Sequence, residues 1–241
     1  MTIKYNRCWT LLIEDNIYMR VYHFISEEYA LDVIADQRIK VSMIDDLNDP
    51  FELHAVDLSN SEYREEFKDF KKHMTQITGI LCFSKRWKSP LLWSHYANKH
   101  KGVALEFDVL DKVAHPIRYR KKRYVLDLER ARKQSYAFSD DEIKELWFTK
   151  YEQWDYEEEI RVVLSKPEFY HDKGNYFYDL GNDIHLTGCI LGPLCNISIS
   201  KIERCLPKDM QITVTKSRLA FRSFDVVKNK LFKTVHQKGN V

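Results

Sequence analysis

Two carboxylates at alternate positions, Glu157 and Glu159, stand where an apolar strand pattern begins. The stretch reads Trp154-Asp155-Tyr156-Glu157-Glu158-Glu159-Ile160-Arg161-Val162-Val163-Leu164. Three adjacent carboxylates repel one another, so a purely structural strand would avoid them or leave them in solvent. Because side chains alternate along a strand, we expect Glu157 and Glu159 to share one face and Glu158 to point the other way. Such a pair can stabilise a developing positive charge or bind a hard cation.

Arg161 follows on the same predicted face as Glu159. Its guanidinium would either keep that carboxylate ionised or bind a phosphate. A structural alternative makes the acids a solvated strand entrance that pairs with Arg161 and Lys150.

A polar turn and a short aromatic helix supply further candidates. The turn at 48–52, Asn48-Asp49-Pro50-Phe51-Glu52, has the composition of a tight turn, and alone it needs no other explanation. Its acids could also bind a metal or a ribose. Trp93-Ser94-His95-Tyr96 holds several hydrogen-bond donors and an imidazole that titrates near neutral pH, and function and packing explain it equally well.

For His23 and for the basic run from Arg118 to Arg123, a structural role explains the residues at least as well as a functional one. His23 lies in an apolar strand pattern, where a histidine is more often a hydrogen-bonded core residue than a catalyst. The basic run from Arg118 to Arg123, with Tyr119 and Tyr124, could bind a phosphate backbone and stack bases. Since the run is short, one solvated face of a strand is the simpler interpretation.

Composition narrows the classes of protein. Aromatic residues make up 13% and apolar residues 44% of the 241 residues, which is ample for a packed core. The 38 basic and 36 acidic residues leave a net charge of +2, so global charge indicates no polyanionic partner. The five cysteines form no CxxC pair, which favours reduced thiols in a cytoplasmic protein. No stretch is apolar enough for a signal peptide or a membrane span, and we expect no membrane partner.

Several nucleotide and hydrolase motifs are missing from the sequence. It has no GxGxxG or Walker glycine loop, no HExxH helix and no GxSxG elbow. With seven glycines in all, a phosphate site must use side chains or a helix N-terminus. Kinases, P-loop proteins, zincins and α/β-hydrolases are therefore excluded.

Periodicity predicts one α+β domain over 1–241, with mixed or antiparallel central sheets and short flanking helices. Strands are expected at 9–13, 20–25, 38–42, 80–83, 103–107, 117–126, 187–191 and 211–215. Helices are expected at 27–36 with Ser26 as its cap, at 61–77, from Pro90 through Tyr96, after a Ser139 capping box, and after a Ser200 capping box. A loop or hairpin is expected at 170–181.

Three segments together resemble the bacterial domain-of-unknown-function 2971 family, over about residues 20–220. They are the turn at 48–52, the segment Leu92-Trp93-Ser94-His95-Tyr96-Ala97 with Gly102 and Glu106-Phe107, and Lys150 with Trp154 and Tyr156-Glu157-Glu158-Glu159-Ile160-Arg161. A late Leu191-Gly192 matches as well. The chain has Leu92 where the family has Met and Ile160 where it has Trp, and both exchanges keep an apolar side chain. This resemblance implies no activity.

A second resemblance is to mono-ADP-ribosyltransferases. Glu157-Glu158-Glu159 running into the apolar strand is similar to their ExE strand, Tyr22-His23 to their first NAD-contacting strand, and Phe83-Ser84 to the strand that braces the catalytic glutamate. The resemblance implies a split sheet and an NAD-consuming enzyme, a toxin or anti-phage effector acting on protein or nucleic acid. It implies Glu159 as the main catalytic carboxylate, with Glu157, His23 and Ser84 beside it.

The resemblance also places the nicotinamide against side chains that could hold an aromatic ring or a ribose. These are Tyr22, Trp93, His95, Tyr96, Asn48 and Arg161, with Trp154 as a further wall. The acceptor, protein or nucleic acid, is expected near Arg118–Arg123, and no bound metal is expected.

Two other functions stay open at this point. A metal-dependent nuclease or hydrolase would use Asp49, Glu52, Glu157, Glu159 and His95, and it requires the turn at 48–52 to meet Glu157 and Glu159 in space. A non-catalytic module would bind a nucleotide or a partner through the same pocket.

Overall fold

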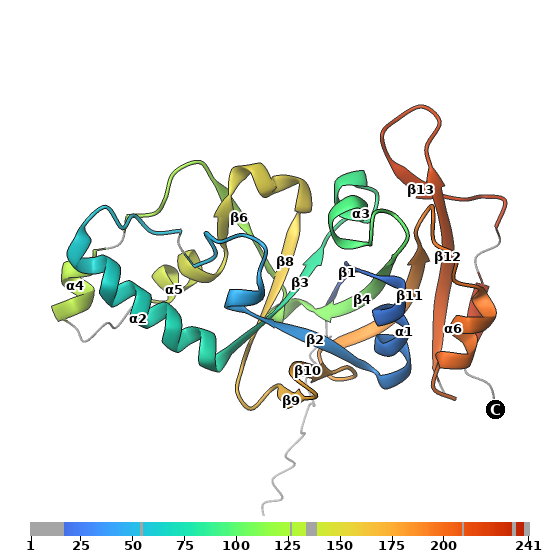
Figure 1. The fold of residues 1–241 in the computed structure, drawn as a ribbon, viewed down its shortest axis with the longest axis horizontal. Coiled ribbons are helices and arrows are strands. Elements are labelled where there is room, and N and C mark those ends of the chain that lie inside the picture. The colour runs from blue at the N-terminus through green and yellow to red at the C-terminus, as the bar shows by residue number, and fades with distance from the viewer. Residues whose placement is uncertain are drawn as a thin grey trace, which may run out of the picture.

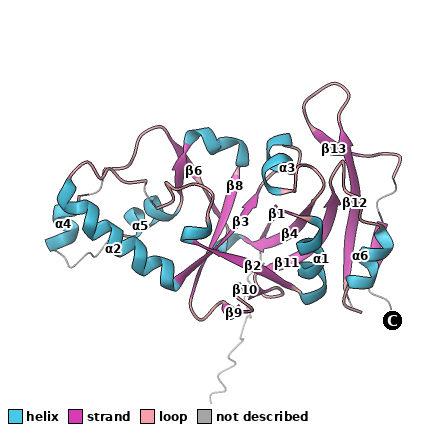
Figure 2. Ribbon diagram, in the orientation of Figure 1, coloured by secondary structure: helices cyan, strands magenta, loops and turns pink. Residues whose placement is uncertain are grey.

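Strands and short helices alternate along the chain in the computed structural model (Figures 1 and 2). The structure describes residues 17–53, 55–125, 127–133, 139–208, 210–232 and 235–238, so the strand expected at 9–13 lies outside the described residues. The helices are α1 Glu27–Asp36, α2 Ser61–Ile77, α3 Pro90–Tyr96, α4 Leu128–Lys133, α5 Asp140–Trp147 and α6 Ile199–Cys205, with 3-10 turns η1 Ile44–Asp46, η2 Asp111–Val113 and η3 Glu152–Glu157.

Most of the described strands belong to one large mixed sheet, and β6 and β7 pair separately. The strands are β1 Tyr18–Ile25, β2 Arg38–Met43, β3 Thr78–Ser84, β4 Val103–Leu110, β5 His115–Pro116, β6 Arg118–Arg120, β7 Thr149–Tyr151, β8 Glu159–Ser165, β9 Tyr170–Asp172, β10 Asn175–Asp179, β11 Ile184–Leu191, β12 Gln211–Leu219, β13 Val226–Lys228 and β14 Val235–Lys238. The expected α+β class is confirmed.

The large sheet is almost divided between β1 and β3. Strand β1 pairs along its whole length with β4, and β3 pairs along its whole length with β8. Between β1 and β3, however, the register holds one pair, Tyr22 opposite Ser84. The two halves of the sheet are therefore joined at this place by a single residue pair.

The core lies mainly around β4, between β1 and β11. Val103, Leu105, Phe107 and Val109 of β4 are fully buried, and α1 packs Val33 and Ile34 into the same apolar cluster. In Figure 1, α2, α4 and α5 gather at one end of the molecule and α1 and α6 at the other. A smaller cluster of Val56, Phe67 and Leu146 holds the first end together. The main cluster continues across the β1–β3 junction, since it also contains Leu81 and Phe83 of β3 and Ile160 of β8.

Several expected elements are found with nearly the expected ends. Helices α1 and α2 begin and end where the pattern placed them, and the 170–181 segment is the hairpin β9–β10. Ser139 caps α5 with a complete capping box to Glu142. Among the described residues no helix is long and apolar enough to cross a membrane.

Three expectations about local structure were wrong. The strand at 117–126 is limited to β6, since Lys121 and Lys122 lie in a bend after Arg120. The cap of α6 is Ser198, whose side chain accepts from the Lys201 N–H, and Ser200 already lies inside the helix. Ser26 occupies the N-cap position of α1, but its hydroxyl makes no capping hydrogen bond.

The difference between a used and an unused cap gives a stability test. Ser139→Ala should lower the free energy of unfolding by about 1 kcal/mol, because it exposes the first turn of α5 without its acceptor. Ser89→Ala is the matched control, since Ser89 precedes α3 without a side-chain capping bond. Urea unfolding curves with an unchanged slope would measure both, and equal losses would contradict the assigned caps.

Candidate functional site

A buried ammonium group, that of Lys150, lies among three carboxylates at the inner end of the sheet split. Its Nζ lies 2.6 Å from Glu157 Oε2, 3.2 Å from Glu159 Oε2 and 3.7 Å from Glu52 Oε1. The indole ring of Trp154 lies 4.8 Å from the same Nζ. Lys150 is held in place because β7 pairs in parallel with β6, opposite Tyr119. One lysine from a three-residue strand therefore joins a turn, a 3-10 helix and β8.

Arg161 completes the cluster from beneath. Its Nε and Nη2 lie 2.9 and 2.8 Å from Glu159 Oε1, and Nη1 and Nη2 each lie 3.0 Å from the Glu52 carboxylate. Nη1 also donates to the Trp147 carbonyl at 2.9 Å. Every guanidinium nitrogen thus has an acceptor inside the protein, and the side chain is 1% exposed. Arg161 was expected to keep Glu159 ionised or to bind a phosphate, and this geometry favours the first role.

The cluster carries one more negative charge than positive when all its groups are ionised. It contains Glu52, Glu157 and Glu159 against Lys150 and Arg161, all of them buried. Burial makes every one of these charges interact strongly, and the surplus must fall on the carboxylate with the weakest support.

The pKa directions show that Glu157 is that carboxylate. Burial raises the pKa of Glu159, but the charges of Arg161 and Lys150 outweigh it and hold that pKa below its usual value. Burial also raises the pKa of Glu157, and there Lys150 and the Tyr96 hydroxyl do not compensate, so the pKa stays raised. Burial tends to lower the pKa of Lys150, yet the three carboxylates together raise it. Lys150 is therefore a fixed cation, and the fold does not favour the charge on Glu157.

Both carboxylates line a cavity of about 250 Å³ at the β1–β3 split. Its walls come from β1, β3, the 42–52 segment, α3 and the Glu157–Glu159 corner. The lining residues are Tyr22, His23, Phe24, Ser42, Asp46, Leu47, Asn48, Glu52, Cys82, Phe83, Ser84, Leu92, Tyr96, Lys150, Glu157 and Glu159. This lining is mainly apolar and aromatic, with acids at one end, as is typical of a small-molecule site.

Glu157 and Glu159 do share a side of the chain, but the expected reason was wrong. Glu157 ends η3 rather than lying on β8, and Glu158 adopts a left-handed conformation with φ of 42°. That corner turns Glu158 outward, where it pairs with Arg86 at 2.7 Å. Both acids then contact the same lysine.

Tyr96 and Asn48 hold Glu157 from the other side. The Tyr96 hydroxyl donates to Glu157 Oε1 at 2.5 Å and accepts from Asn48 Nδ2 at 2.7 Å. Burial and the neighbouring Glu157 charge raise the pKa of Tyr96, so it remains a neutral donor. The 48–52 turn is itself closed by Asp49, whose Oδ1 accepts from the Phe51 N–H.

His23 and Ser84 lie in the cavity wall, next to one another across the split. His23 Nδ1 lies 2.9 Å from the Cys82 carbonyl, so Nδ1 carries the proton and Nε2 is the acceptor of the neutral ring. Burial lowers the pKa of His23, which keeps it neutral at pH 7. The Ser84 hydroxyl lies 2.6 Å from the Glu157 carbonyl oxygen, so Ser84 holds the backbone of the acidic corner rather than the Glu159 carboxylate.

The remaining predicted residues lie outside the cavity. Trp93 is fully buried under Phe24, with its indole N–H donating to the Trp87 carbonyl, and so it is a core residue rather than a wall. His95 is exposed and faces the ring of Tyr156. Trp154 contacts Lys150 but does not line the cavity.

The metal alternative required the 48–52 turn to meet the acidic pair, and Glu52 does meet it. However, the three carboxylates point at Lys150 and Arg161, which hold the positions that a cation would take. Asp49 is used within its own turn and His95 lies on the surface. Among the described residues no group of three His, Cys, Asp or Glu side chains is arranged to hold a metal ion.

Comparison with known proteins bears on this site. Residues 92–162 match the family model described as "Protein of unknown function (DUF2971)". The expected resemblance to this family is thereby confirmed over that segment, which contains Tyr96, Lys150, Glu157, Glu159 and Arg161. No curated protein matches the chain, and no solved structure matches it. The comparisons give no support to the second resemblance, that to ADP-ribosyltransferases.

The sequence contains a signal for the central lysine beyond its place in the family motif. Lys150 lies among the aromatic residues Phe148, Tyr151 and Trp154, and this position predicts a buried amine that needs carboxylates. Cys82 gave no signal of this kind, because a cysteine in an apolar strand is typical of any core.

The opposite pKa directions predict opposite effects of two isosteric changes at neutral pH. Glu159 has a lowered pKa in the fold, so its charge contributes stability above about pH 4.3, the ordinary glutamate pKa, and this contribution is lost as the pH falls through the folded value. Glu159→Gln should therefore lower the free energy of unfolding at pH 7 by about 1–3 kcal/mol.

Glu157 has a raised pKa, so the fold favours its protonated form, and this advantage is lost as the pH rises through the folded value. Glu157→Gln should leave stability at pH 7 unchanged or slightly increased. Urea unfolding of both variants from pH 4 to pH 8 would measure the difference, which should shrink toward pH 4. A larger loss for Glu157→Gln than for Glu159→Gln would contradict this assignment.

Proposed function

We propose that the cavity binds NAD and that the protein cleaves its nicotinamide–ribose bond, transferring ADP-ribose to an acceptor. The observation that carries this proposal is Glu157, a carboxylate that faces an aromatic cavity and whose charge the fold does not favour. A group kept in an energetically unfavourable charge state inside a cavity is a candidate for chemistry. The β1–β3 split and the acidic corner on β8 support the same reading.

The reaction needs what the cavity offers. When the C1′–N bond of NAD breaks, the electron pair leaves with nicotinamide, and positive charge develops on the ribose ring. A nearby carboxylate stabilises that charge, as in glycoside cleavage generally. An acceptor oxygen or nitrogen then bonds to C1′ and loses its proton. The nicotinamide ring of NAD is itself cationic, so the surplus negative charge of the cluster also favours its binding.

Hydrogen-bond capacity divides the roles of the two carboxylates. A carboxylate offers about four acceptor positions. Those of Glu159 are taken by two Arg161 donors, by Lys150 and by the Cys82 thiol. Glu157 receives Tyr96 and Lys150 and keeps two positions open. In this proposal Glu157 receives the ribose hydroxyl, and Glu159 fixes Lys150 and the electrostatics, which reverses the roles that the resemblance implied.

The volume of the cavity suits one end of the dinucleotide. About 250 Å³ lies just below the usual range for ligand pockets, so the cavity would hold the nicotinamide and its ribose. Tyr22, Phe24 and Phe83 would enclose the ring, with neutral His23 Nε2 as a hydrogen-bond acceptor.

A second groove adjoins the cavity and shares Tyr22 with it. It encloses about 590 Å³ and includes Lys85, Lys88 and Trp87. Lys85 and Lys88 are exposed, and cations beside an aromatic ring suit a pyrophosphate with an adenine. We assign this groove to the ADP portion of NAD. An activity of this kind would suit a toxin or an anti-phage effector.

The second candidate is a non-catalytic nucleotide sensor that uses the same cavity. The ion pairs of Lys150 and Arg161 with the carboxylates favour a sensor as much as a catalyst, because a rigid polar cluster also suits ligand binding. Turnover separates the two functions.

The test is release of nicotinamide from NAD by the purified protein, supplied with cell extract, RNA or DNA as acceptor. Wild type should release it, and Glu157→Gln should reduce the rate by about 100-fold or more, since one charge-stabilising group is lost. Glu28→Gln is the control, because this acid is exposed on α1 and lines neither the cavity nor the groove, and its rate should stay within about twofold.

Two results would contradict the proposal. One is wild-type protein that binds NAD but releases no nicotinamide with any acceptor, which favours the sensor. The other is a Glu157→Gln variant that keeps the wild-type rate.

A further inference from the structure

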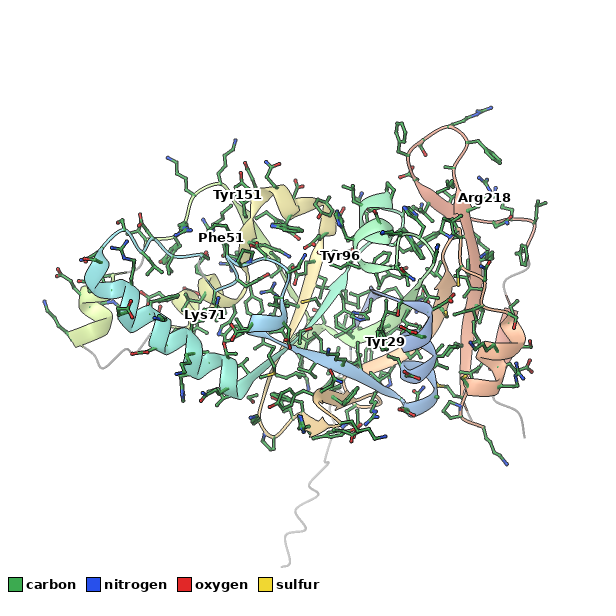
Figure 3. All side chains as sticks on the ribbon, in the orientation of Figure 1. Tyr29, Phe51, Lys71, Tyr96, Tyr151 and Arg218 are labelled. Atoms are coloured by element: carbon green, nitrogen blue, oxygen red, sulfur yellow. The ribbon has the colours of Figure 1, made fainter. Side chains whose placement is uncertain are left out.

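Another cavity, distinct from the groove with Lys85 and Lys88, has a volume of about 330 Å³ and lies on the far side of Lys150 from the NAD cavity. Its lining residues are Phe51, Ala55, Arg120, Lys121, Lys122, Arg123, Thr149, Lys150 and Tyr151. Lys150 lines both cavities, so the two sites meet at the acidic cluster. Figure 3 labels Phe51 and Tyr151 close together, with Tyr96 of the first cavity to one side.

Two aromatic rings at this cavity are exposed to solvent. Phe51 is 55% exposed and Tyr151 is 49% exposed. Phe51 belongs to the turn that brings Glu52 into the cluster, and Tyr151 follows Lys150 directly. The backbone positions of both rings are therefore fixed by the same residues that build the acidic cluster.

The cations around these rings differ in how far they are already neutralised. Arg118 and Arg120 both contact Glu145 Oε1, at 2.6 and 2.8 Å, so their role is largely structural. Lys121 has a 79% exposed side chain and reaches Glu152 only at 3.8 Å. The Arg123 guanidinium lies 5.2 Å from the centre of the Phe51 ring. Lys121, Lys122 and Arg123 thus present positive charge beside the two aromatic rings.

We propose that this cavity binds a single-stranded nucleic acid and presents it to the NAD cavity as the acceptor. Lysine and arginine side chains neutralise the phosphates, and unpaired bases stack on Phe51 and Tyr151. Bases of a duplex are stacked inside the helix and cannot use exposed rings in this way, so the two aromatics favour a single strand. An acidic peptide would use the lysines but would gain little from the rings.

The role of the strand as acceptor rests on the proposed NAD function. An oxygen or nitrogen of the bound strand would form the new bond to C1′ of the ribose as nicotinamide leaves, and its proton would pass to solvent. Binding of the strand does not depend on that chemistry, so it is tested without NAD.

The test is fluorescence anisotropy with labelled 12-nucleotide single-stranded RNA, DNA of the same sequence, and the matching duplex, with polyglutamate as a competitor. Wild type should bind at least one single strand at 50 mM salt about tenfold more tightly than the duplex. The combined change Phe51→Ala and Tyr151→Ala should weaken binding about tenfold or more. Lys121→Gln with Lys122→Gln should reduce the slope of log affinity against log salt by about 1.4.

Matched controls come from the opposite end of the molecule. Phe224 is 95% exposed on the loop between β12 and β13, and Lys201 is exposed on α6. Phe224→Ala and Lys201→Gln should leave the affinity within about twofold. Glu157→Gln should also bind the strand like wild type, so that a failure of the NAD chemistry is distinguishable from a failure of this site.

Several results would overturn the proposal. They are no binding of either single strand at 50 mM salt, equal affinity for the duplex, displacement by polyglutamate at equal charge concentration, or a loss with Phe224→Ala as large as with the paired aromatic change. Equal binding of RNA and DNA supports the proposal and indicates that the site does not recognise the sugar.

Discussion

The contact between Lys150 and its three carboxylates determines how the rest of this structure is arranged. A buried ammonium group requires compensation, and it draws together segments that lie far apart in the chain: the turn that carries Glu52, the end of η3 at Glu157, and the start of β8 at Glu159. Arg161 then joins Glu52 to Glu159 from beneath. Without these two cations the three acids would repel one another, and the corner at Glu158 would open.

Compensation is incomplete, and the incomplete part faces the cavity. Glu159 is supported on both oxygens by Arg161 and Lys150, whereas Glu157 has one cation and one phenol, which do not offset the cost of its burial. The fold therefore disfavours the ionised form of Glu157, at the point where one residue pair joins the two halves of the sheet. Natural proteins lose stability in this way at functional sites, since a charge that stabilises a transition state is seldom the one that stabilises the fold.

Local patterns in the sequence predicted most elements of the fold, because the ends of helices and strands depend on nearby residues. The apolar residues at helical spacing predicted the extent of helix α2, and the Ser139 capping box predicted the start of α5. The acidic pair was also found, through alternation along an assumed strand. The actual geometry depends on a left-handed Glu158, which alternation alone cannot predict because the conformation is fixed by tertiary contacts.

Long-range features were beyond the sequence patterns. Trp93 is of a residue type common in binding sites, yet it is a core residue. Its burial could not be predicted locally, because its partners Phe24 and Trp87 lie outside its helix. The hydrogen bonding of Arg161 depends partly on Glu52, which lies 109 residues earlier. Within the basic run, Arg118 and Arg120 are neutralised by Glu145, whereas the later cations are not. The sequence alone could not predict this difference, because Glu145 lies on another element.

The central claim is that the surplus negative charge at Glu157 favours a cationic ring in the cavity. The most direct measurement compares the affinities of 1-methylnicotinamide, a cation with no glycosidic bond to cleave, and neutral nicotinamide by chemical-shift titration at low salt. We expect wild type to bind the cation at least about tenfold more tightly, a difference of about 1.4 kcal/mol, and Glu157→Gln to abolish this preference. Equal affinities in wild type, or a preference that survives Glu157→Gln, would contradict it.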